Sequence, residues 1–92
     1  MKRVEKKIWP EYFDAVASGK KTFELRLNDF AIAEGDTLVL REWDPKTKEY
    51  TGRVVEKTVG YVKAWSIDDL KKFWHQTDMK EKGIVVMSLK DK

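Results

Sequence analysis

The clearest pattern of hydrophobic and polar positions lies in residues 22–27, TFELRL, where the two kinds of residue alternate. A period of two predicts a β-strand with one apolar face and one polar face. The apolar face consists of Phe23, Leu25 and Leu27. The polar face, which we expect to point outward, consists of Thr22, Glu24 and Arg26.

A short helix is predicted immediately before this strand, over residues 10–18. Pro10 suits the first helical position, where its missing N–H is not needed. Phe13 and Val16 recur at helical spacing, so one face of the helix should pack on a sheet. Gly19 is expected to end the helix in the left-handed conformation.

The remaining chain predicts further strands and one more helix. Strands are expected over residues 4–8, 37–43, 49–62 and 84–89, the third bent at Gly52 or Gly60. Residues 84–89 are almost continuously apolar, which is typical of a strand covered on both faces. A Ser-x-x-Asp capping box at Ser66 predicts the second helix. The order of elements predicts an α+β domain with a curled, mostly antiparallel sheet or open barrel and two short helices.

Length and composition limit the possible classes of protein. The 92 residues predict one domain over residues 1–92, because a second core would leave each core too small to be stable. Without cysteine, disulfides and thiolate metal sites are excluded, and one histidine argues against a zinc site. We therefore expect neither a metal nor a cofactor.

Charge and hydropathy bear on partners and location. The chain has 19 Lys and Arg against 16 Asp and Glu, a net charge of +3. This excess is a weak indication of a polyanionic partner, and a mixed soluble surface explains it equally well. No apolar run approaches the roughly 20 residues of a membrane span, and no signal peptide is recognisable at the start. We expect a cytoplasmic protein without a membrane partner.

Glu24 and Arg26 are the first candidates for a binding site. They lie two positions apart on one strand face, about 6–7 Å along the strand, so both can point into one cavity. A glutamate accepts hydrogen bonds and an arginine donates them from a planar fork, so the pair could recognise a base edge, a carboxylate or a phosphate. The simpler alternative is the polar outer face of a half-exposed strand.

Lys20 and Lys21 have the same two interpretations. Both favour the negative C-terminus of the preceding helix, which needs no ligand. Either could instead contact a phosphate or, if desolvated, act as a base or nucleophile. Strict alternation places Lys21 with Phe23 on the apolar face. Lys21 joins Glu24 only if the turn after Gly19 redirects it.

Trp9 and Trp43 are the best aromatic candidates for walls of a ligand site. Trp9 precedes a helix start and Trp43 ends a strand, and an exposed aromatic ring can stack on an unpaired base. Aromatic residues at such spacings more often belong to the core. The sequence contains no glycine-rich phosphate loop, nucleophile elbow or metal-ligand spacing.

Gly19, Lys21, Glu24 and Arg26 fit the G-x-K-x-x-E-x-R signature of the ASCH domains of the PUA-like superfamily. The segments IWPEYFDAVASGKKTFELRLND, LREWD, EYTGR and GIVVMSL also resemble one small ASCH-related bacterial and phage family of unknown function. The resemblance implies a PUA-like pseudo-barrel with short helices beside it. It also implies a cleft along the signature strand, which the wider superfamily uses for RNA or modified bases.

The resemblance makes Lys21, Glu24 and Arg26 the cleft residues, with Trp9 at the rim and Trp43 a further wall. Some ASCH proteins are ribonucleases, and a sister group of amidohydrolases acts on acylated cytidine with a Lys, a Thr and a Glu. In that group the threonine lies three positions after the lysine, where this chain has Glu24. The amidohydrolase site is therefore not reproduced residue for residue.

Three hypotheses of function follow. The first is a module that binds RNA or a nucleotide-like ligand through residues 19–26, with Lys20 as an additional cation. The second is a hydrolase of modified nucleosides or RNA, in which Lys21 and Glu24 would be catalytic. The third is a protein-interaction module that binds an acidic peptide. We favour binding over catalysis, and the sequence predicts no oligomeric state.

Overall fold

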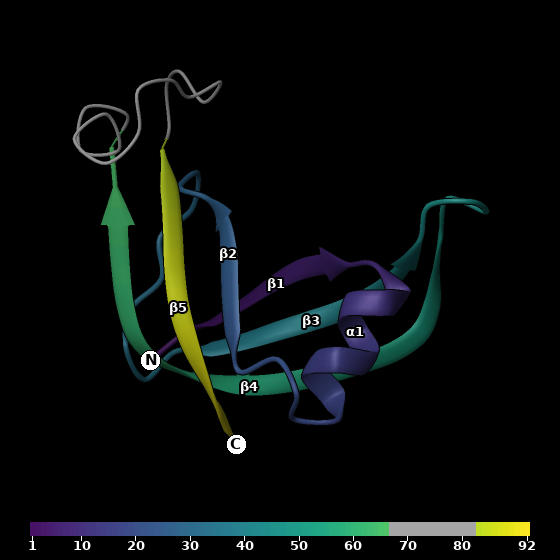
Figure 1. Cartoon of the computed structure of the whole chain (residues 1–92), viewed down its shortest axis with the longest axis horizontal. Coiled ribbons are helices and arrows are strands. Elements are labelled where there is room, and N and C mark those ends of the chain that lie inside the picture. Colours follow the sequence, from purple (N-terminus) through teal and green to yellow (C-terminus); the bar gives the residue numbers. More distant parts are fainter. Residues whose placement is uncertain (67–82) are drawn as a thin grey trace.

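The computed structural model describes residues 1–66 and 83–92, which form a curled sheet with one short helix (Figure 1). The elements are β1 (Arg3–Ile8), α1 (Pro10–Ala17), β2 (Phe23–Leu27), β3 (Thr37–Asp44), β4 (Glu49–Trp65) and β5 (Ile84–Asp91). The prediction of strands and a first helix is confirmed to within a few residues at each end. The second helix, predicted to begin at Ser66, lies outside the described residues.

The strands form one sheet in the order β1-β3-β4-β5-β2. β1 pairs with β3 in parallel, and the other three pairings are antiparallel. The expectation of a curled, mostly antiparallel sheet is therefore confirmed. Within the described strands, β1 and β2 are the two edges of the sheet although they are close in sequence.

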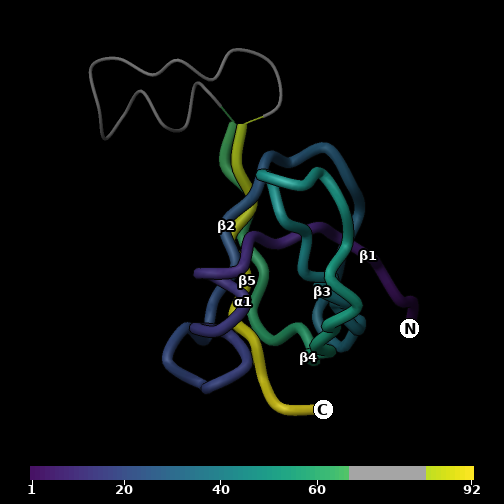
Figure 2. The backbone as a smooth tube through the Cα atoms, turned by 90° about the vertical axis from the view of Figure 1, so that its right-hand side faces the viewer, coloured from purple at the N-terminus to yellow at the C-terminus, as the bar shows by residue number. Residues whose placement is uncertain are grey.

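β4 curls the sheet because it pairs with different strands along its length. Its first part pairs with β3 and its second part with β5, and the register shifts between Val59 and Val62, around Gly60. The long strand bends through this region in Figure 1, and the backbone winds back on itself in Figure 2. The predicted bend near Gly60 is confirmed, and the curl turns the two edges toward one side of the molecule.

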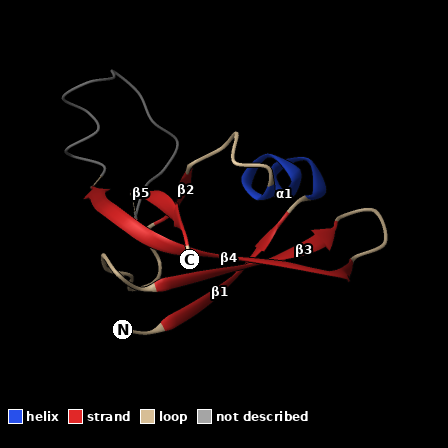
Figure 3. Cartoon of the chain, turned by 90° about the horizontal axis from the view of Figure 1, so that it is seen from below, coloured by secondary structure: helices blue, strands red, loops and turns tan. Residues whose placement is uncertain are grey.

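The hydrophobic core fills the inside of the curl. Helix α1 lies against one face of the sheet above β3 and β4 (Figure 3), and it contributes the buried Phe13 and Val16. Each such buried apolar side chain stabilises the fold by about 1.5–3 kcal/mol. The core residues are Ile8, Phe13, Val16, Leu38, Leu40, Val59, Val85, Met87 and Leu89.

The ends of α1 follow the sequence pattern. Pro10 occupies the first helical position, and the carbonyl of Trp9 accepts the N–H of Phe13 at 2.8 Å. Gly19 adopts φ of +85° just after the helix, as its position predicted. The chain can therefore leave the helix sharply toward β2.

The two faces of β2 are reversed from the prediction. The register pairs Glu24 with Met87, which is fully buried, so Glu24 points to the inside of the curl and is itself only 3% exposed. Phe23, Leu25 and Leu27 point outward and are about half exposed. Alternation defines two faces, but only the pairing with β5 determines which of them is inside.

β5 is covered on one face more than on the other. Val85, Met87 and Leu89 are buried, whereas Val86 is half-buried and Ser88 is exposed. The prediction of a strand covered on both faces is therefore confirmed for the inner face, whereas the outer face is covered only in part. Its outer face is continuous with the exposed outer face of β2.

Candidate functional site

An open cleft lies between the two edge strands, and residues of β1, α1 and β2 line it. Its volume is about 540 Å³, within the range of roughly 300–1,000 Å³ usual for small-molecule sites. The charged and aromatic residues used below are Lys6, Lys7, Trp9, Tyr12, Lys21, Glu24 and Arg26. The cleft is the place where the curled sheet does not close.

Glu24 lies in the cleft between two cations. Lys21 Nζ donates to Oε1 at 2.5 Å, and Arg26 Nη1 donates to Oε2 at 2.8 Å. The carboxylate is 4% exposed, whereas the side chains of Lys21 and Arg26 are 20% and 26% exposed. The three side chains therefore form a cluster with a net charge of one positive unit, whose cations face the opening.

Lys21 reaches Glu24 because it precedes the strand. β2 begins at Phe23, so the alternation of the strand does not apply to Lys21. After the left-handed turn at Gly19, the backbone N–H of Lys21 donates to the carbonyl of Ala15 at 2.9 Å. This turn holds the lysine beside the end of α1, from where its ammonium extends to the carboxylate.

Arg26 also joins the two edges of the sheet. Its Nη2 donates to the backbone carbonyl of Lys7 in β1 at 3.1 Å. Nearby, Lys6 Nζ lies 4.0 Å from Asp29 and 4.0 Å from the ring centroid of Phe30, both on the segment after β2. These contacts link β1 to β2 across the cleft, so its walls are held in place without a ligand.

Trp9 and Tyr12 form the aromatic rim. Trp9, which directly precedes α1, is 51% exposed, and Tyr12 on α1 is 47% exposed. Lys21 Nζ lies 5.8 Å from the Tyr12 ring centroid, within the range of a cation–π contact. The exposed faces of these rings are available for stacking.

Two of the residues selected from the sequence do not line the cleft. Lys20 is exposed after the end of α1 and contributes no lining atoms. Trp43 lies on β3 opposite Tyr50 of β4, with Lys7 Nζ 4.5 Å from its ring centroid. Of the predicted set, Lys21, Glu24, Arg26 and Trp9 meet at the cleft.

The sequence interpretation missed the lysines of β1. Lys6 lies between Val4 and Ile8, which both point into the curl, so the same alternation places a cation on the inside. That position was the available signal, because a lysine flanked by inward apolar residues needs a reason to be there. Tyr12 also lines the cleft and is not among the residues predicted from the sequence.

The clearest pKa shifts belong to carboxylates outside the cleft. Hydrogen bonds from Arg3 and then Lys92 lower the pKa of Glu56 from 4.5 to about 2. The pKa of Asp36 is also lowered, because its carboxylate accepts the backbone N–H groups of Lys2 and Ala33. These groups fix the two chain ends and the loop before β3, so we assign them a structural role.

Residues 1–66 and 83–92 contain no group of three or more His, Cys, Asp or Glu side chains placed to hold a metal ion. Within the same residues, no helix is both long and apolar enough to cross a membrane.

The arrangement in the cleft suits recognition of an anionic, partly planar ligand. An arginine carries five N–H donors and a lysine carries three, and the contacts described above use only some of them. Glu24 retains lone pairs that can accept from an N–H group of a ligand. Lys6 and Lys7 add positive charge on the opposite wall, against the negative charge of Asp29.

Comparison with known proteins gives a family without an assigned activity. Residues 4–74 match the family described as a domain of unknown function (DUF3850). The chain is also 44% identical over 55 residues to an uncharacterized 12.9 kDa protein in the GpA 3′ region of Escherichia phage P2. The match covers 60% of this chain and 49% of the phage protein, so the chain spans about half the length of that relative.

Proposed function

We propose that this chain, which belongs to the DUF3850 family of unknown function, is a module that binds RNA or a nucleotide-like ligand. The ligand occupies the cleft between β1 and β2. The signature residues Lys21, Glu24 and Arg26 recognise the ligand. Trp9 and Tyr12 stack on its base, and the lysines of β1 attract its phosphate.

We further infer that the fold is of the PUA-like kind and that the cleft is the ASCH-type cleft. Two observations support this inference. The sheet is curled and open at one seam, and three residues of the G-x-K-x-x-E-x-R signature meet at that seam although Lys21 lies outside the strand. Spacing alone would not bring the lysine to the other two.

The buried position of Glu24 at an open cleft carries the proposal. Removing a carboxylate from water costs several kcal/mol, which its two cations offset only with good geometry. A purely structural ion pair at this position would be replaceable by an apolar side chain that fills the space. Here the ion pair is beside an unfilled volume of about 540 Å³, where its remaining donors and acceptors can contact a ligand.

The expected interactions are strong enough for a useful affinity. Hydrogen bonds that involve a charged group contribute about 1.5–3 kcal/mol, and each stacked base contributes about 1–3 kcal/mol. Two charged contacts and one stack together contribute about 4–9 kcal/mol, which corresponds to a dissociation constant in the millimolar to micromolar range. Aromatic stacking tolerates any base, so selectivity would come from Glu24 and Arg26.

The test is a binding titration of labelled single-stranded RNA and ribonucleoside monophosphates with wild-type protein and matched variants. Arg26→Lys keeps the charge but loses the planar fork, and we expect on the order of tenfold weaker binding. Trp9→Ala should weaken binding by a similar factor, whereas Tyr61→Ala, which removes another exposed ring far from the cleft, should not.

An affinity that does not change in Arg26→Lys and Trp9→Ala would place binding elsewhere on the molecule. Displacement of the RNA by an acidic peptide at equal concentration would favour the protein-interaction hypothesis instead. Either result contradicts the proposal.

A hydrolase is the second candidate, because Lys21 Nζ donates to Glu24 Oε1 in the cleft, and a lysine or glutamate in a cleft can act as a nucleophile or base. The assay is turnover of acylated cytidine and of labelled RNA. Turnover that is absent in wild-type protein, or that persists in both Lys21→Ala and Glu24→Ala, excludes catalysis at this site.

A further inference from the structure

A second pocket, which we call the side pocket, adjoins the cleft. It has a volume of about 320 Å³ and is lined by Glu5, Lys6, Lys7, Arg26, Arg41 and Tyr50. Lys6, Lys7 and Arg26 line both spaces. Neither the sequence pattern nor the family match assigns a role to Arg41, and Tyr50 is not among the site residues predicted from the sequence.

The two spaces meet over the edge of β1, where no described strand pairs with it and Arg26 Nη2 donates to the carbonyl of Lys7. Lys6 and Lys7 are consecutive residues of this strand, so their side chains point to opposite faces of the sheet. Lys6 is on the inner face with Ile8, whereas Lys7 is paired with Arg41 on the other face. Because β1 is an edge of the sheet, no described strand separates the cleft from the side pocket. A ligand can therefore cross the edge at Lys6 and Lys7.

The side pocket has the chemistry of a phosphate and base site. Four of its lining residues are cations, and its one carboxylate, Glu5, lies 3.5 Å from Arg41 Nη1. The guanidinium of Arg41 lies 3.9 Å from the ring centroid of Tyr50, and Lys7 Nζ lies 5.8 Å from it. Tyr50 remains 43% exposed. An aromatic ring with two cations beside it can stack on a base while the cations bind the adjoining phosphate.

We propose that the ligand is a single-stranded nucleic acid rather than a free nucleotide, and that the side pocket holds the nucleotide next to the one in the cleft. This inference rests on the proposed function of the cleft. Tyr50 stacks on the second base, Arg41 contacts its phosphate, and Lys6 and Lys7 bind the phosphate that crosses the edge of β1. A double helix does not fit this arrangement, because its bases are paired and stacked on one another.

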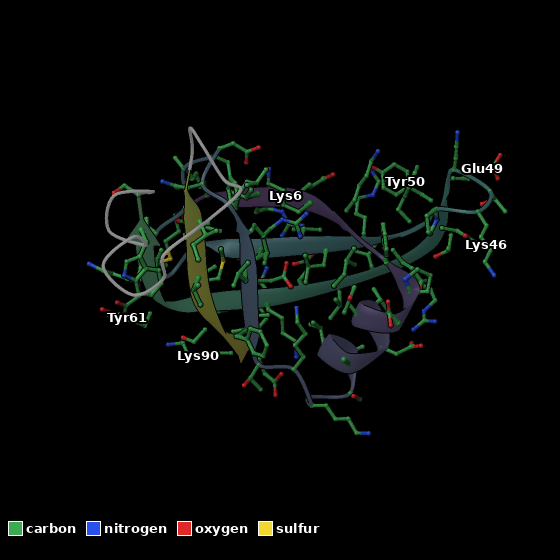
Figure 4. The ribbon with its side chains drawn as sticks, turned by 45° about the horizontal axis from the view of Figure 1, so that its top comes forward. Lys6, Lys46, Glu49, Tyr50, Tyr61 and Lys90 are labelled. Atoms are coloured by element: carbon green, nitrogen blue, oxygen red, sulfur yellow. The ribbon has the colours of Figure 1, made fainter. Side chains whose placement is uncertain are left out.

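The positions of the side chains favour this path over others on the surface. Figure 4 shows Lys6 and Tyr50 in the upper part of the view, whereas Tyr61 and Lys90 lie at the lower left. Trp43 lies beside Tyr50, since the two residues are paired across β3 and β4. Trp43 itself lines neither the cleft nor the side pocket.

The experiment compares two ligands with the same base, a ribonucleoside monophosphate and a short single-stranded homopolymer, on four proteins. The proteins are the wild type, Tyr50→Ala, Arg41→Gln and the control Tyr61→Ala. We expect the wild type and the control to bind the homopolymer on the order of tenfold more tightly than the monophosphate. Tyr50→Ala and Arg41→Gln should lose most of this difference and still bind the monophosphate with unchanged affinity.

Other outcomes separate this inference from the proposed function. If wild-type protein binds both ligands equally, the side pocket holds no nucleotide and the inference fails, while the cleft proposal stands. If Tyr50→Ala weakens both ligands by the same factor, the side pocket is not a separate subsite and the inference also fails. If neither ligand binds wild-type protein, the proposed function fails and the inference fails with it.

Discussion

Glu24 is the residue on which the properties of the cleft depend. It is buried on the inner face of an edge strand, and each carboxylate oxygen accepts from one cation. The spacing of Glu24 and Arg26 predicted that both side chains can point into one cavity, because residues two apart share a strand face. It could not predict the burial, since the short strand contains an equally good apolar face.

Replacing Glu24 with alanine should destabilise the protein. Loss of the carboxylate leaves Lys21 and Arg26 near each other without their partner. Because both cations keep contact with solvent, we expect a loss of about 1–3 kcal/mol, below the 3–5 kcal/mol typical of fully buried pairs. The measurement is the free energy of unfolding in urea, with the exposed Glu34→Ala as control. A loss no larger than that of the control would contradict the structural role of the cluster.

Glu56 should make the protein sensitive to acid. Its pKa in the folded protein is about 2, against 4.5 for an unperturbed glutamate, because Arg3 and Lys92 donate to its carboxylate. The stabilisation is therefore complete above pH 4.5 and is lost as the pH falls from 4.5 toward 2. The shifts of Asp36 and Asp91 have the same direction and add to the effect.

The measurement for Glu56 is the free energy of unfolding as a function of pH. Glu56→Gln should have a shallower decline in the acid range than wild-type protein, and Glu34→Gln should decline like wild type. Parallel curves for wild type and Glu56→Gln would show that the ion pair with Arg3 and Lys92 does not contribute.

For the individual elements, the sequence predicted where each strand begins and ends better than which face of the strand is buried. Turn residues and alternation determine the bounds of β2, β3 and β4, and the structure confirms them within a few residues. The direction in which β2 faces depends on its pairing with β5, which follows almost sixty residues later in the chain. The path of Lys21 depends on a single turn at Gly19, where strand alternation no longer applies. Both features require long-range or conformational information that a local pattern does not contain.

Which face of β2 is buried can be tested by replacing leucine with alanine at two positions, one in β2 and one in β3. Leu25 is 56% exposed on its outer face, whereas Leu40 of β3 is fully buried. Leu25→Ala should change the free energy of unfolding by no more than about 0.5 kcal/mol, and Leu40→Ala should cost about 2–5 kcal/mol. Equal losses in the two variants, measured by chemical denaturation, would mean that the apolar face of β2 is buried after all.

At the scale of the whole molecule, the main feature is a sheet that curls but does not close. β1 and β2 approach each other as its edges, and Arg26 connects them through the carbonyl of Lys7. The unclosed seam leaves a space with cations on both walls and aromatic rings at one end. The proposed recognition of a ligand at the open seam would account for the burial of Glu24, the lysines of β1 and the exposed rings together.

Binding should consequently depend on salt. Each phosphate neutralised on a single strand contributes a slope of about −0.7 in a plot of log affinity against log salt concentration. Lys6→Gln should make this slope shallower, whereas Lys90→Gln, on the far end of β5, should leave it unchanged. An equal effect of the two substitutions would indicate that only the net charge of the protein attracts the ligand.

The proposed binding of nucleic acid in the cleft is tested most directly by an NMR titration of the isotopically labelled protein with short single-stranded RNA. We predict that the amide signals of residues 6–9, 12 and 21–26 shift together and saturate at one ligand concentration, and that those of the outer face of β5 do not move. If none of the signals of residues 19–26 shifts at millimolar RNA, the cleft does not bind nucleic acid and the proposed function is wrong.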